Sequence, residues 1–546
     1  MGNDLVNSIS DAAPGRKIRV SLTDEAREIF GFLGHEWLKA VIRSVCLAHT
    51  DESISLVLLA ADTEPMFVSN SHQLHLEDDF SHNHGLGLIS LDLEKGRRIR
   101  RRVSIPSLPL YKDELPYKFG STGSLLKRKI GSIYSKVYSK APVLLDCIRQ
   151  YRNVKKDWMD GTCPKGAPEL FPLNDAVSKK NDQFTAWFAF HWLEPGGAES
   201  WAFKAAELAR DAGMRVVITA DKTAPQRALE RALKITDEVY LGGNLFMDKD
   251  WPSFNRKLAE KYNFDLVFIH HSSTVYDFLP ELKLLCPNAK IYDSTHIIEH
   301  RTGGYVRSSV ELSNLVDLHH VISPVLRDFY LHDCEIDPEK IAYKPLTGLD
   351  AQDDASERIV PPVGVPLKVG FIGRLAPQKR PFLFVELVKR LHKSSPGSFK
   401  FVMQGSGSLN KYVSEQIKKA GLTDLIDRRE WGPADEFYAE IDVLVICSDN
   451  EGLTLTALEA DTHNVVVVSA DVGSQVSVVA PDMLLDAQPL KFLRQAKRVI
   501  KKLASDREYF DSILETQHSM HQRVREIQPA VNYFANLFGE LVKEDK

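Results

Sequence analysis

Two glutamates, Glu451 and Glu459, stand on either side of a predicted helix start. The apolar run 443–447 before them is typical of a buried strand, and residues 450–454 are typical of the turn that leads from it into a helix. The first turn of a helix presents unpaired N–H groups and a partial positive charge, which suit phosphate, and neighbouring carboxylates can accept hydrogen bonds from sugar hydroxyls. The turn can therefore hold a sugar nucleotide. The alternative is an ordinary helix with Glu451 as a cap and Glu459 on its solvated face.

Two further turns carry residues suited to phosphate. Arg374 and Lys379 stand close together after the apolar run 367–373, where an arginine fork and a lysine can converge on a diphosphate. Solvated surface charges are the alternative. The pair Gly196 and Gly197 follows an earlier apolar run, and glycines let a backbone approach a ligand closely at a helix start, although they also make plain tight turns.

These turns belong to two stretches in which short apolar runs alternate with helical patterns. The runs of the first stretch are 184–191, 214–220, 265–271, 290–296 and 318–323. Those of the second are 367–373, 399–405, 443–448 and 465–470, with helical patterns such as 382–391 and 409–420. The alternation predicts two parallel sheets with crossover helices. Because ligands bind at the carboxyl ends of the strands in such sheets, we expect the three turns to face a cleft between two domains.

Composition and charge exclude several classes of protein. A net charge of −5 over 546 residues gives no electrostatic footprint for nucleic acid. Six cysteines without a Cys-x-x-Cys pair argue for a reducing compartment, with the cytoplasm as the expectation, and against a structural metal. The N-terminal residues lack the features of a signal peptide, and no apolar run approaches the roughly 18 to 20 residues that cross a bilayer.

The first part of the chain is expected to fold, but its role is not indicated by its residues. Apolar spacing predicts a helix at 37–47 and a strand at 54–61. The basic segment 97–102 is predicted to be an exposed strand end, and the proline-containing passage 106–109 a loop. A linker is expected at 164–172.

A second basic segment, 125–140, has apolar residues at helical spacing. Such a helix can lie on an anionic membrane surface, or it can dock its apolar face on its own protein. Peripheral contact with a membrane through 97–102 and 125–140 is therefore one of two interpretations.

Together the turns resemble the retaining glycosyltransferases of family 4, which have the GT-B fold of two Rossmann-like domains facing across a cleft. Residues 451–459 are similar to the family's Glu-x7-Glu signature after an Asp-hydrophobic-Ser strand at 442–448. The loop 373–379 resembles its Gly-Arg-Leu-x-x-x-Lys loop. Residues 196–199 resemble its Gly-Gly-x-Glu turn, and 404–407 its Gly-x-Gly turn. Four motifs in this order are far more specific than any one of them.

The resemblance implies a role for each matching residue. Arg374 and Lys379 would bind the donor pyrophosphate and stabilise the charge on the leaving group. Glu451 would hold donor sugar hydroxyls near the reacting carbon, and Glu459 the ribose hydroxyls. The other donor-binding residues would be Gly196, Gly197, Gly373, Gly405 and the amides of Leu453 and Thr454.

His296 stands where the family often has a histidine near the sugar and the acceptor. A structural histidine is the alternative, and His270, His271 and His300 compete for the same place. No metal or cofactor is expected, because Arg374 and Lys379 can take the part of a cation.

The resemblance also divides the chain. It implies an acceptor-side domain at 183–350, completed by a C-terminal helix at 526–546, and a nucleotide-sugar-binding domain at 366–525. A polar connector, 351–366, joins them, and the resemblance does not reach the α+β extension 1–182.

The sequence departs from the family after Glu459. The usual Gly-x-Pro turn is replaced at 461–465, and 471–475 keeps one glycine, Gly473, of the usual pair. These changes weaken inference about the pocket for the nucleotide's base and sugar.

We therefore expect a bacterial-type glycosyltransferase, cytoplasmic or peripheral at the inner face of a membrane. It would move a sugar, with retention, from a nucleoside diphosphate sugar to a hydroxyl of a glycan or lipid-linked acceptor, in surface polysaccharide or glycolipid synthesis. Two alternatives remain. One is a GT-B epimerase or phosphorylase that acts on sugar nucleotides, and the other is a non-catalytic scaffold that binds them.

Overall fold

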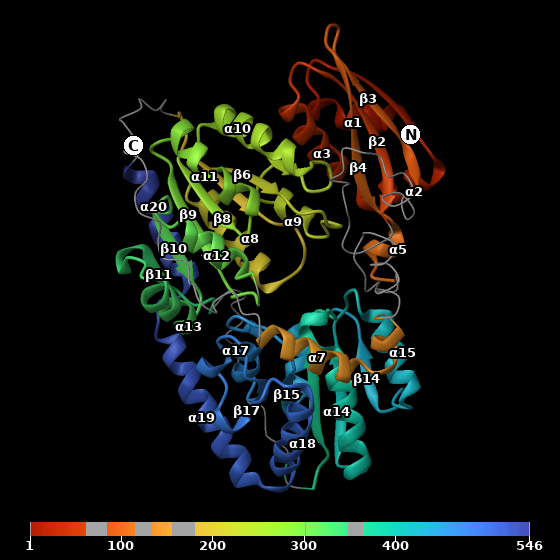
Figure 1. The fold of residues 1–546 in the computed structure, drawn as a ribbon, viewed down its shortest axis with the longest axis vertical. Coiled ribbons are helices and arrows are strands. Elements are labelled where there is room, and N and C mark those ends of the chain that lie inside the picture. The colour runs from red at the N-terminus through yellow and green to blue at the C-terminus, as the bar shows by residue number, and fades with distance from the viewer. Residues whose placement is uncertain are drawn as a thin grey trace.

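The computed structural model describes residues 2–61, 84–114, 134, 136–154, 181–300, 302–347, 362 and 364–544. These residues form a four-stranded sheet near the N-terminus and two larger sheets of seven and six strands. In Figure 1 the first two sheets occupy the upper half of the molecule, and the third lies below them. Most of the predicted helix at 125–140, the linker at 164–172 and most of the connector at 351–366 lie outside the described residues.

The N-terminal sheet has the strand order β1-β3-β2-β4. β3 pairs antiparallel with β1 and β2, whereas β2 and β4 run parallel. The strands are β1 (Lys17–Leu22), β2 (Ser53–Ala61), β3 (Gly85–Asp92) and β4 (Arg98–Pro106), and the helices are α1 (Gly2–Ile9), α2 (Asp24–Leu33) and α3 (His35–Ala48). The predicted helix at 37–47 and strand at 54–61 are confirmed. α3 buries Trp37, Val41 and Val45, and it also contacts the neighbouring domain.

The prediction of a loop at 106–109 is wrong. β4 continues to Pro106, and α5 (Leu108–Tyr111) follows it directly. The side chain of Ser107 caps this short helix by accepting a hydrogen bond from the backbone N–H of Leu110. A proline in the first helical turn costs no hydrogen bond, because the N–H groups there have no partner inside the helix.

The seven-stranded sheet is parallel, in the order β11-β10-β9-β8-β5-β6-β7. Its strands are β5 (Thr185–Phe190), β6 (Arg215–Ala220), β7 (Val239–Leu241), β8 (Leu266–His270), β9 (Lys290–Thr295), β10 (Leu318–Val321) and β11 (Ile341–Tyr343). Its helices are α8 (Gly197–Asp211), α9 (Leu229–Leu233), α10 (Trp251–Tyr262), α11 (Ser273–Leu285), α12 (Gly304–Glu311) and α13 (Pro324–Asp328). All five predicted strands are present.

The six-stranded sheet is also parallel, in the order β14-β13-β12-β15-β16-β17. Its strands are β12 (Leu367–Ile372), β13 (Phe399–Gln404), β14 (Ile426–Arg429), β15 (Val443–Ile446), β16 (Val466–Ala470) and β17 (Leu484–Leu485). Its helices are α14 (Pro381–Ser394), α15 (Asn410–Lys419), α16 (Ala434–Glu440), α17 (Leu455–Thr462), α18 (Pro489–Ser505) and α19 (Arg507–Arg525). The four predicted strands are present here too, and helices cover the sheets so that the central strands are buried on both faces.

Two helices pack on a different domain from the one that is next to them in the sequence. The last helix, α20 (Ala530–Glu544), packs on α8 of the first Rossmann-like domain, where Phe534 meets Trp201 with ring centroids 5.4 Å apart. α7 (Pro142–Val154), although it precedes both Rossmann-like domains, packs on α14 and α18 of the second. Figure 1 shows α7 in the lower half of the molecule, away from the N-terminal sheet. The described residues of the N-terminal extension therefore contact both domains.

Candidate active site

The loops at the carboxyl ends of the two large sheets contact each other. Asn450 Nδ2 donates a hydrogen bond to the backbone oxygen of Ile298, 2.8 Å away. A Cβ atom built on Gly197 would lie 3.2 Å from Leu455 Cδ1, so the glycine turn of the first domain rests against the start of α17 in the second. The glycine turn of the first domain and the Glu451 turn of the second therefore lie against each other.

Lys379 and Glu451 form an ion pair across two loops of the second domain. Lys379 Nζ lies 2.5 Å from Glu451 Oε1, and Glu451 is only 6% exposed. Gln378 Nε2 donates to the backbone oxygen of Asn450 at 2.8 Å, so neighbouring residues tie the same loops together. Both charges lie beside the N-terminus of α17, as the sequence predicts. An ammonium, a carboxylate and unpaired helix N–H groups thus converge on one place.

Two glycines allow the backbone around Glu451 to pack this closely. A Cβ atom on Gly452 would lie 2.0 Å from the backbone oxygen of His296, and one on Gly473 would lie 1.7 Å from that of Glu451. Gly473 also has a φ of +56°, which favours glycine. The single glycine retained in 471–475 is therefore required by the fold of the turn. Leu453 and Thr454, which precede α17, are buried.

Arg374 reaches from the second domain to the glycine turn of the first. Its Nη2 donates to the backbone oxygen of Pro195, and its guanidinium lies over the ring of Trp192, with the carbon 5.4 Å from the ring centroid. A Cβ on Gly196 would lie 3.2 Å from the same Nη2 and 2.1 Å from Glu199 Oε2. Arg374 and Lys379 therefore have different partners, and both lie at the interdomain surface.

Glu199 is a buried carboxylate in the first turn of α8. Trp192 Nε1 donates to its Oε1 at 2.5 Å, and His191 Nε2 lies 3.3 Å from the same oxygen. Burial opposes ionisation, but the hydrogen bond from His191 and the charge of Arg374 outweigh it and hold the pKa of Glu199 at about 2. The carboxylate is therefore ionised at neutral pH.

Histidines line a small hollow at the carboxyl ends of the strands of the seven-stranded sheet. Its lining residues are Phe190, His191, Ala198, Glu199, Ala202, His270, His271, Ser294 and His296. His296 Nε2 is hydrogen-bonded to Ser294 Oγ at 2.9 Å, and its ring centroid lies 5.0 Å from that of His271. His271 in turn stacks on Tyr305.

Three imidazoles in this hollow, those of His270, His271 and His296, are held neutral. Burial, assisted by the charge of neighbouring histidines, lowers the pKa of His271 to about 3 and that of His296 well below its ordinary range. Burial also lowers the pKa of His270. A neutral imidazole has one donor and one acceptor nitrogen, so these rings suit the hydroxyls of a sugar. His300 is not among the residues that line the hollow, and its Nε2 lies 3.0 Å from the backbone oxygen of Asp449.

The remaining predicted residues lie at the carboxyl ends of strands of the six-stranded sheet and on α17. A Cβ on Gly405 would lie 2.1 Å from the backbone oxygen of Gly373, which explains the glycine there, and both have positive φ angles. Glu459 Oε2 accepts a hydrogen bond from the hydroxyl of Tyr438 at 2.7 Å. Glu459 therefore lies on α17, one helix turn beyond the glycine-packed start, with its carboxylate turned towards α16.

Several residues of the site were missed by sequence reasoning. His191 and Trp192 directly follow β5, so the rule that ligands bind at the carboxyl ends of strands could have included them. Tyr438 on α16 gives no such signal, because only the packing of α16 against α17 brings it to Glu459.

Among the residues that the structure describes, no three or more His, Cys, Asp or Glu side chains are grouped so as to hold a metal ion. None of the described helices has the length and apolar character needed to cross a bilayer.

Parts of the chain are similar to known glycosyltransferases. Residues 354–523 match the model of a family described as glycosyl transferases group 1. The chain is 34% identical over 91 residues to a Campylobacter jejuni alpha-1,4-N-acetyl-D-galactosaminyltransferase, which covers 16% of this chain and 25% of the relative. It is 26% identical over 167 residues to the D-inositol 3-phosphate glycosyltransferase of Corynebacterium glutamicum, covering 28% and 40%. The chain thus spans less than half the length of these relatives.

The fold also has a solved counterpart. The pneumococcal O-GlcNAc transferase GtfA, in complex with UDP and GlcNAc, superposes with a TM-score of 0.51 at 13% identity, over 67% of this chain and 99% of the other. This likeness confirms the predicted GT-B fold of two Rossmann-like domains. The match to the glycosyl transferases group 1 model covers the second Rossmann-like domain and part of the connector before it.

Proposed function

We propose that the protein is a retaining glycosyltransferase that moves a sugar from a nucleoside diphosphate sugar to an acceptor hydroxyl. The observation that carries the proposal is the meeting of Lys379 and Glu451 at the N-terminus of α17, at the interdomain surface. Retention and membership of family 4 rest on the resemblance of the Glu451 to Glu459 turn to that family's signature.

The donor would bind with its diphosphate at the start of α17. There Lys379 would exchange part of its contact with Glu451 for the phosphate oxygens, and Arg374 would approach from the same side. Fixed cations and helix N–H groups stabilise the negative charge that develops on the leaving diphosphate. Glu451 would then hold hydroxyls of the transferred sugar, and Glu459 those of the ribose.

The acceptor would bind against the histidine hollow of the first domain. His296 reaches this hollow with its ring and the Glu451 turn with its backbone, which supports a place for it beside the sugar. Because His271 and His296 are neutral at physiological pH, they can orient hydroxyl groups without adding a positive charge.

The names of two relatives indicate a class of acceptor. The Campylobacter jejuni relative is named for a glycan linked through PP to undecaprenol, and the Corynebacterium glutamicum relative for D-inositol 3-phosphate. We propose a glycan or lipid-linked acceptor in surface polysaccharide or glycolipid synthesis, in a reducing compartment such as the cytoplasm. The thiols of Cys46, Cys147, Cys286 and Cys447 are free, which supports the compartment.

The first test is binding and turnover by the full chain. A thermal shift screen over nucleoside diphosphates and their sugars should find a ligand that raises the melting temperature. A radiolabelled form of that donor should then give product only with acceptor, and the anomeric configuration of the product reports retention. Label that rearranges without acceptor would point to an epimerase, and release of a sugar phosphate to a phosphorylase.

Matched variants make this test specific. Lys379→Ala and Glu451→Ala should each lower the transfer rate about a hundredfold or more, because each removes a group placed at the developing charge. Lys400→Ala on β13 and Glu436→Ala on α16 remove exposed charges of the same domain and should leave the rate unchanged. Full activity of Lys379→Ala and Glu451→Ala would show that the proposed transfer mechanism is wrong.

Two further elements of the proposal are tested separately. No metal is required, because Lys379 and Arg374 supply the positive charge, so transfer should persist in EDTA. Peripheral contact with an anionic membrane through 97–102 and 125–140 predicts flotation with vesicles that contain phosphatidylglycerol. Failure to float would remove the membrane contact without affecting the catalytic proposal.

A further inference from the structure

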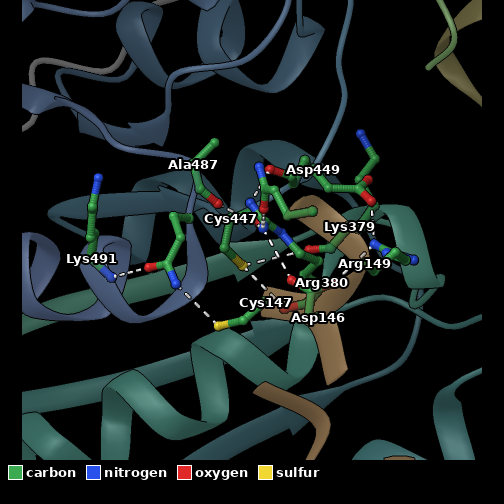
Figure 2. Close-up of polar contacts among 12 residues, drawn as sticks. Asp146, Cys147, Arg149, Lys379, Arg380, Cys447, Asp449, Ala487 and Lys491 are labelled. Atoms are coloured by element: carbon green, nitrogen blue, oxygen red, sulfur yellow. Dashed lines mark hydrogen bonds and ion pairs between the residues drawn. The ribbon is translucent and has the colours of Figure 1, made fainter. Parts of the chain in front are cut away.

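We propose that α7, from the N-terminal extension, holds the two donor-binding loops of the second Rossmann-like domain in register, and that Asp146 and Arg149 are positioning residues for Lys379 and Glu451. This inference rests on the proposed function for the role of those loops. Figure 2 shows the contacts, in which α7 lies against the loop that contains Arg380 and the loop that contains Asp449.

The first tie is made by Arg380, the residue after Lys379. Its side chain is fully buried, with 0% exposure. Nη1 donates to Asp146 Oδ2 at 3.2 Å and to Gln150 Oε1 at 3.0 Å, both on α7. On its other edges the guanidinium donates from Nε to the backbone oxygen of Cys447 at 2.5 Å and from Nη2 to that of Ser448 at 2.5 Å. One side chain therefore joins α7, its own loop and the loop that leads to Glu451.

The second tie is made by Arg149 on α7. Its Nη2 contacts the carboxylate of Asp449, two residues before Glu451, and lies 3.0 Å from Asp146 Oδ1. Asp146 therefore lies between two arginines, and Arg149 lies between two aspartates. The result is a row of alternating charges, Arg380, Asp146, Arg149 and Asp449, which begins in one donor loop, passes through α7 and ends in the other (Figure 2).

The backbone of the loop shows why an outside support is needed. Arg380 has a φ of +46°, a left-handed conformation that an arginine seldom adopts without tertiary contacts to hold it. This residue is the point at which the chain turns from Lys379 into α14. The buried hydrogen bonds of its guanidinium hold the turn, and the turn sets the direction of the Lys379 side chain.

Because the charges of this row are largely buried, each of the four side chains depends on its neighbours in the row. A buried charge is tolerated only with its partners, so loss of one member leaves an unpaired charge that draws water or moves the loop. A shift of about 1 Å at a reacting group can lower a rate by a hundredfold. Asp146 and Arg149 therefore act on the reaction through Arg380 and Asp449, and α7 is a working part of the donor site.

The experiment uses the full chain and a double-mutant cycle on Arg149 and Asp449, because the Arg149 side chain, at 30% exposed, is the least buried of the four charges in the row. The variants are Arg149→Met, Asp449→Asn, their combination and the conservative Arg149→Lys. Arg390→Met is the matched control, since this arginine of α14 is 34% exposed and pairs with Glu386 inside its own helix. The probe is UDP, the nucleotide bound by the pneumococcal transferase, measured by titration calorimetry and followed by donor KM and kcat.

We expect Arg149→Met and Asp449→Asn each to weaken UDP binding about tenfold and to lower kcat further, with the double variant no worse than either single one. Arg149→Lys should recover part of the loss, and Arg390→Met should bind UDP as the wild type does. Equal binding in wild type and Arg149→Met, or losses that simply add in the double variant, would overturn the inference.

Hydrogen exchange keeps this inference separate from the proposed function. Arg149→Met should speed amide exchange in both loops, 374–380 and 448–451, without ligand and without a matching change in the first domain. If wild type binds no nucleoside diphosphate but the loops still loosen, the proposed function fails and the tie through α7 stands. Unchanged exchange in both loops would refute the tie whatever the ligand.

Discussion

The ammonium of Lys379 lies 2.5 Å from the carboxylate of Glu451, and the two residues come from loops that follow different strands of one sheet. Glu451 therefore pairs with the cation that we assign to the donor diphosphate. The donor diphosphate would therefore compete with Glu451 for the Lys379 ammonium, and both residues would contact the donor once it is bound.

This relationship predicts that binding and transfer respond differently to the two residues. Glu451→Gln should bind UDP as tightly as wild type or more tightly, because it frees Lys379 and removes a negative charge near the phosphates. It should still lower kcat about a hundredfold. Lys379→Met should weaken UDP binding at least about tenfold, the effect expected when one charge-assisted contact is lost. Titration calorimetry with UDP and initial rates separate these effects, and equal weakening of UDP binding in both variants would contradict the competition.

The turn at Gly473 should tolerate no side chain. Gly473→Ala places a Cβ 1.7 Å from the backbone oxygen of Glu451, and the positive φ adds strain. We expect a loss of about 3 kcal/mol or more in the free energy of unfolding, together with weakened donor binding.

Gly421→Ala is the matched control for this prediction. Gly421 has a φ of +68°, but a Cβ built there has no atom within 4 Å. Gly421→Ala should lower the free energy of unfolding only by the cost of the left-handed backbone conformation, about 1 kcal/mol, and should leave donor binding unchanged. Urea denaturation gives the stability of each variant, and similar losses at both positions would show that the contact with Glu451 does not matter.

Arg227 should anchor the N-terminal extension to the first domain. Its guanidinium donates to the backbone oxygens of Leu110 and Tyr111, to Asp113 Oδ1 at 2.8 Å and to Glu194 Oε2 at 2.6 Å. Glu194 lies in the loop that leads to the Gly196 turn. Arg227→Met should therefore destabilise the protein by about 3 kcal/mol, because it leaves two largely buried carboxylates unpaired.

The control for Arg227 is an exposed arginine. Arg307 pairs with Glu311 one turn away on α12, and both side chains are about half exposed, so Arg307→Met should cost about 0.5 kcal/mol or less. Limited proteolysis should also cut the Arg227→Met variant sooner near residues 108–114. Equal stability of the two variants would mean that the extension is held by its apolar contacts alone.

The buried histidines should make stability depend on pH. The pKa of His271 falls from its ordinary value of 6.5 to about 3 through burial and the nearby His191. Between these values the unfolded chain binds a proton that the folded chain does not, so stability falls as the pH drops below 6.5. The contribution of His271 is up to about 1.4 kcal/mol for each pH unit.

His271→Asn removes this contribution. Its stability relative to wild type should therefore improve steadily between pH 6.5 and pH 5, as measured by urea denaturation. His332→Asn, which replaces an exposed imidazole, is the control for the substitution itself. A difference between His271→Asn and wild type that stays constant over that range would show that His271 takes up a proton in the folded protein.

The sequence by itself determined the alternation of strands and helices and the turns that carry the candidate site. Each of these depends on local pattern: a run of apolar residues fits a buried strand, and a turn at its carboxyl end faces the ligand edge of the sheet. This is why Lys379, Glu451 and Gly197 were found. It is also why β7, β11 and β17 were missed, since strands of two or three residues are too short to show a period, and why β14 was missed, since three of its four residues are charged.

The tertiary structure decided which residues are partners. Nothing local in α7 indicates that Asp146 meets Arg380 or that Arg149 meets Asp449, because these pairs join segments more than two hundred residues apart. The same holds for Glu199 and Arg374, which belong to different domains. Such contacts follow from how the domains and the N-terminal extension pack. A buried charge is stable only beside its partner, and the sequence does not show which residue that partner is.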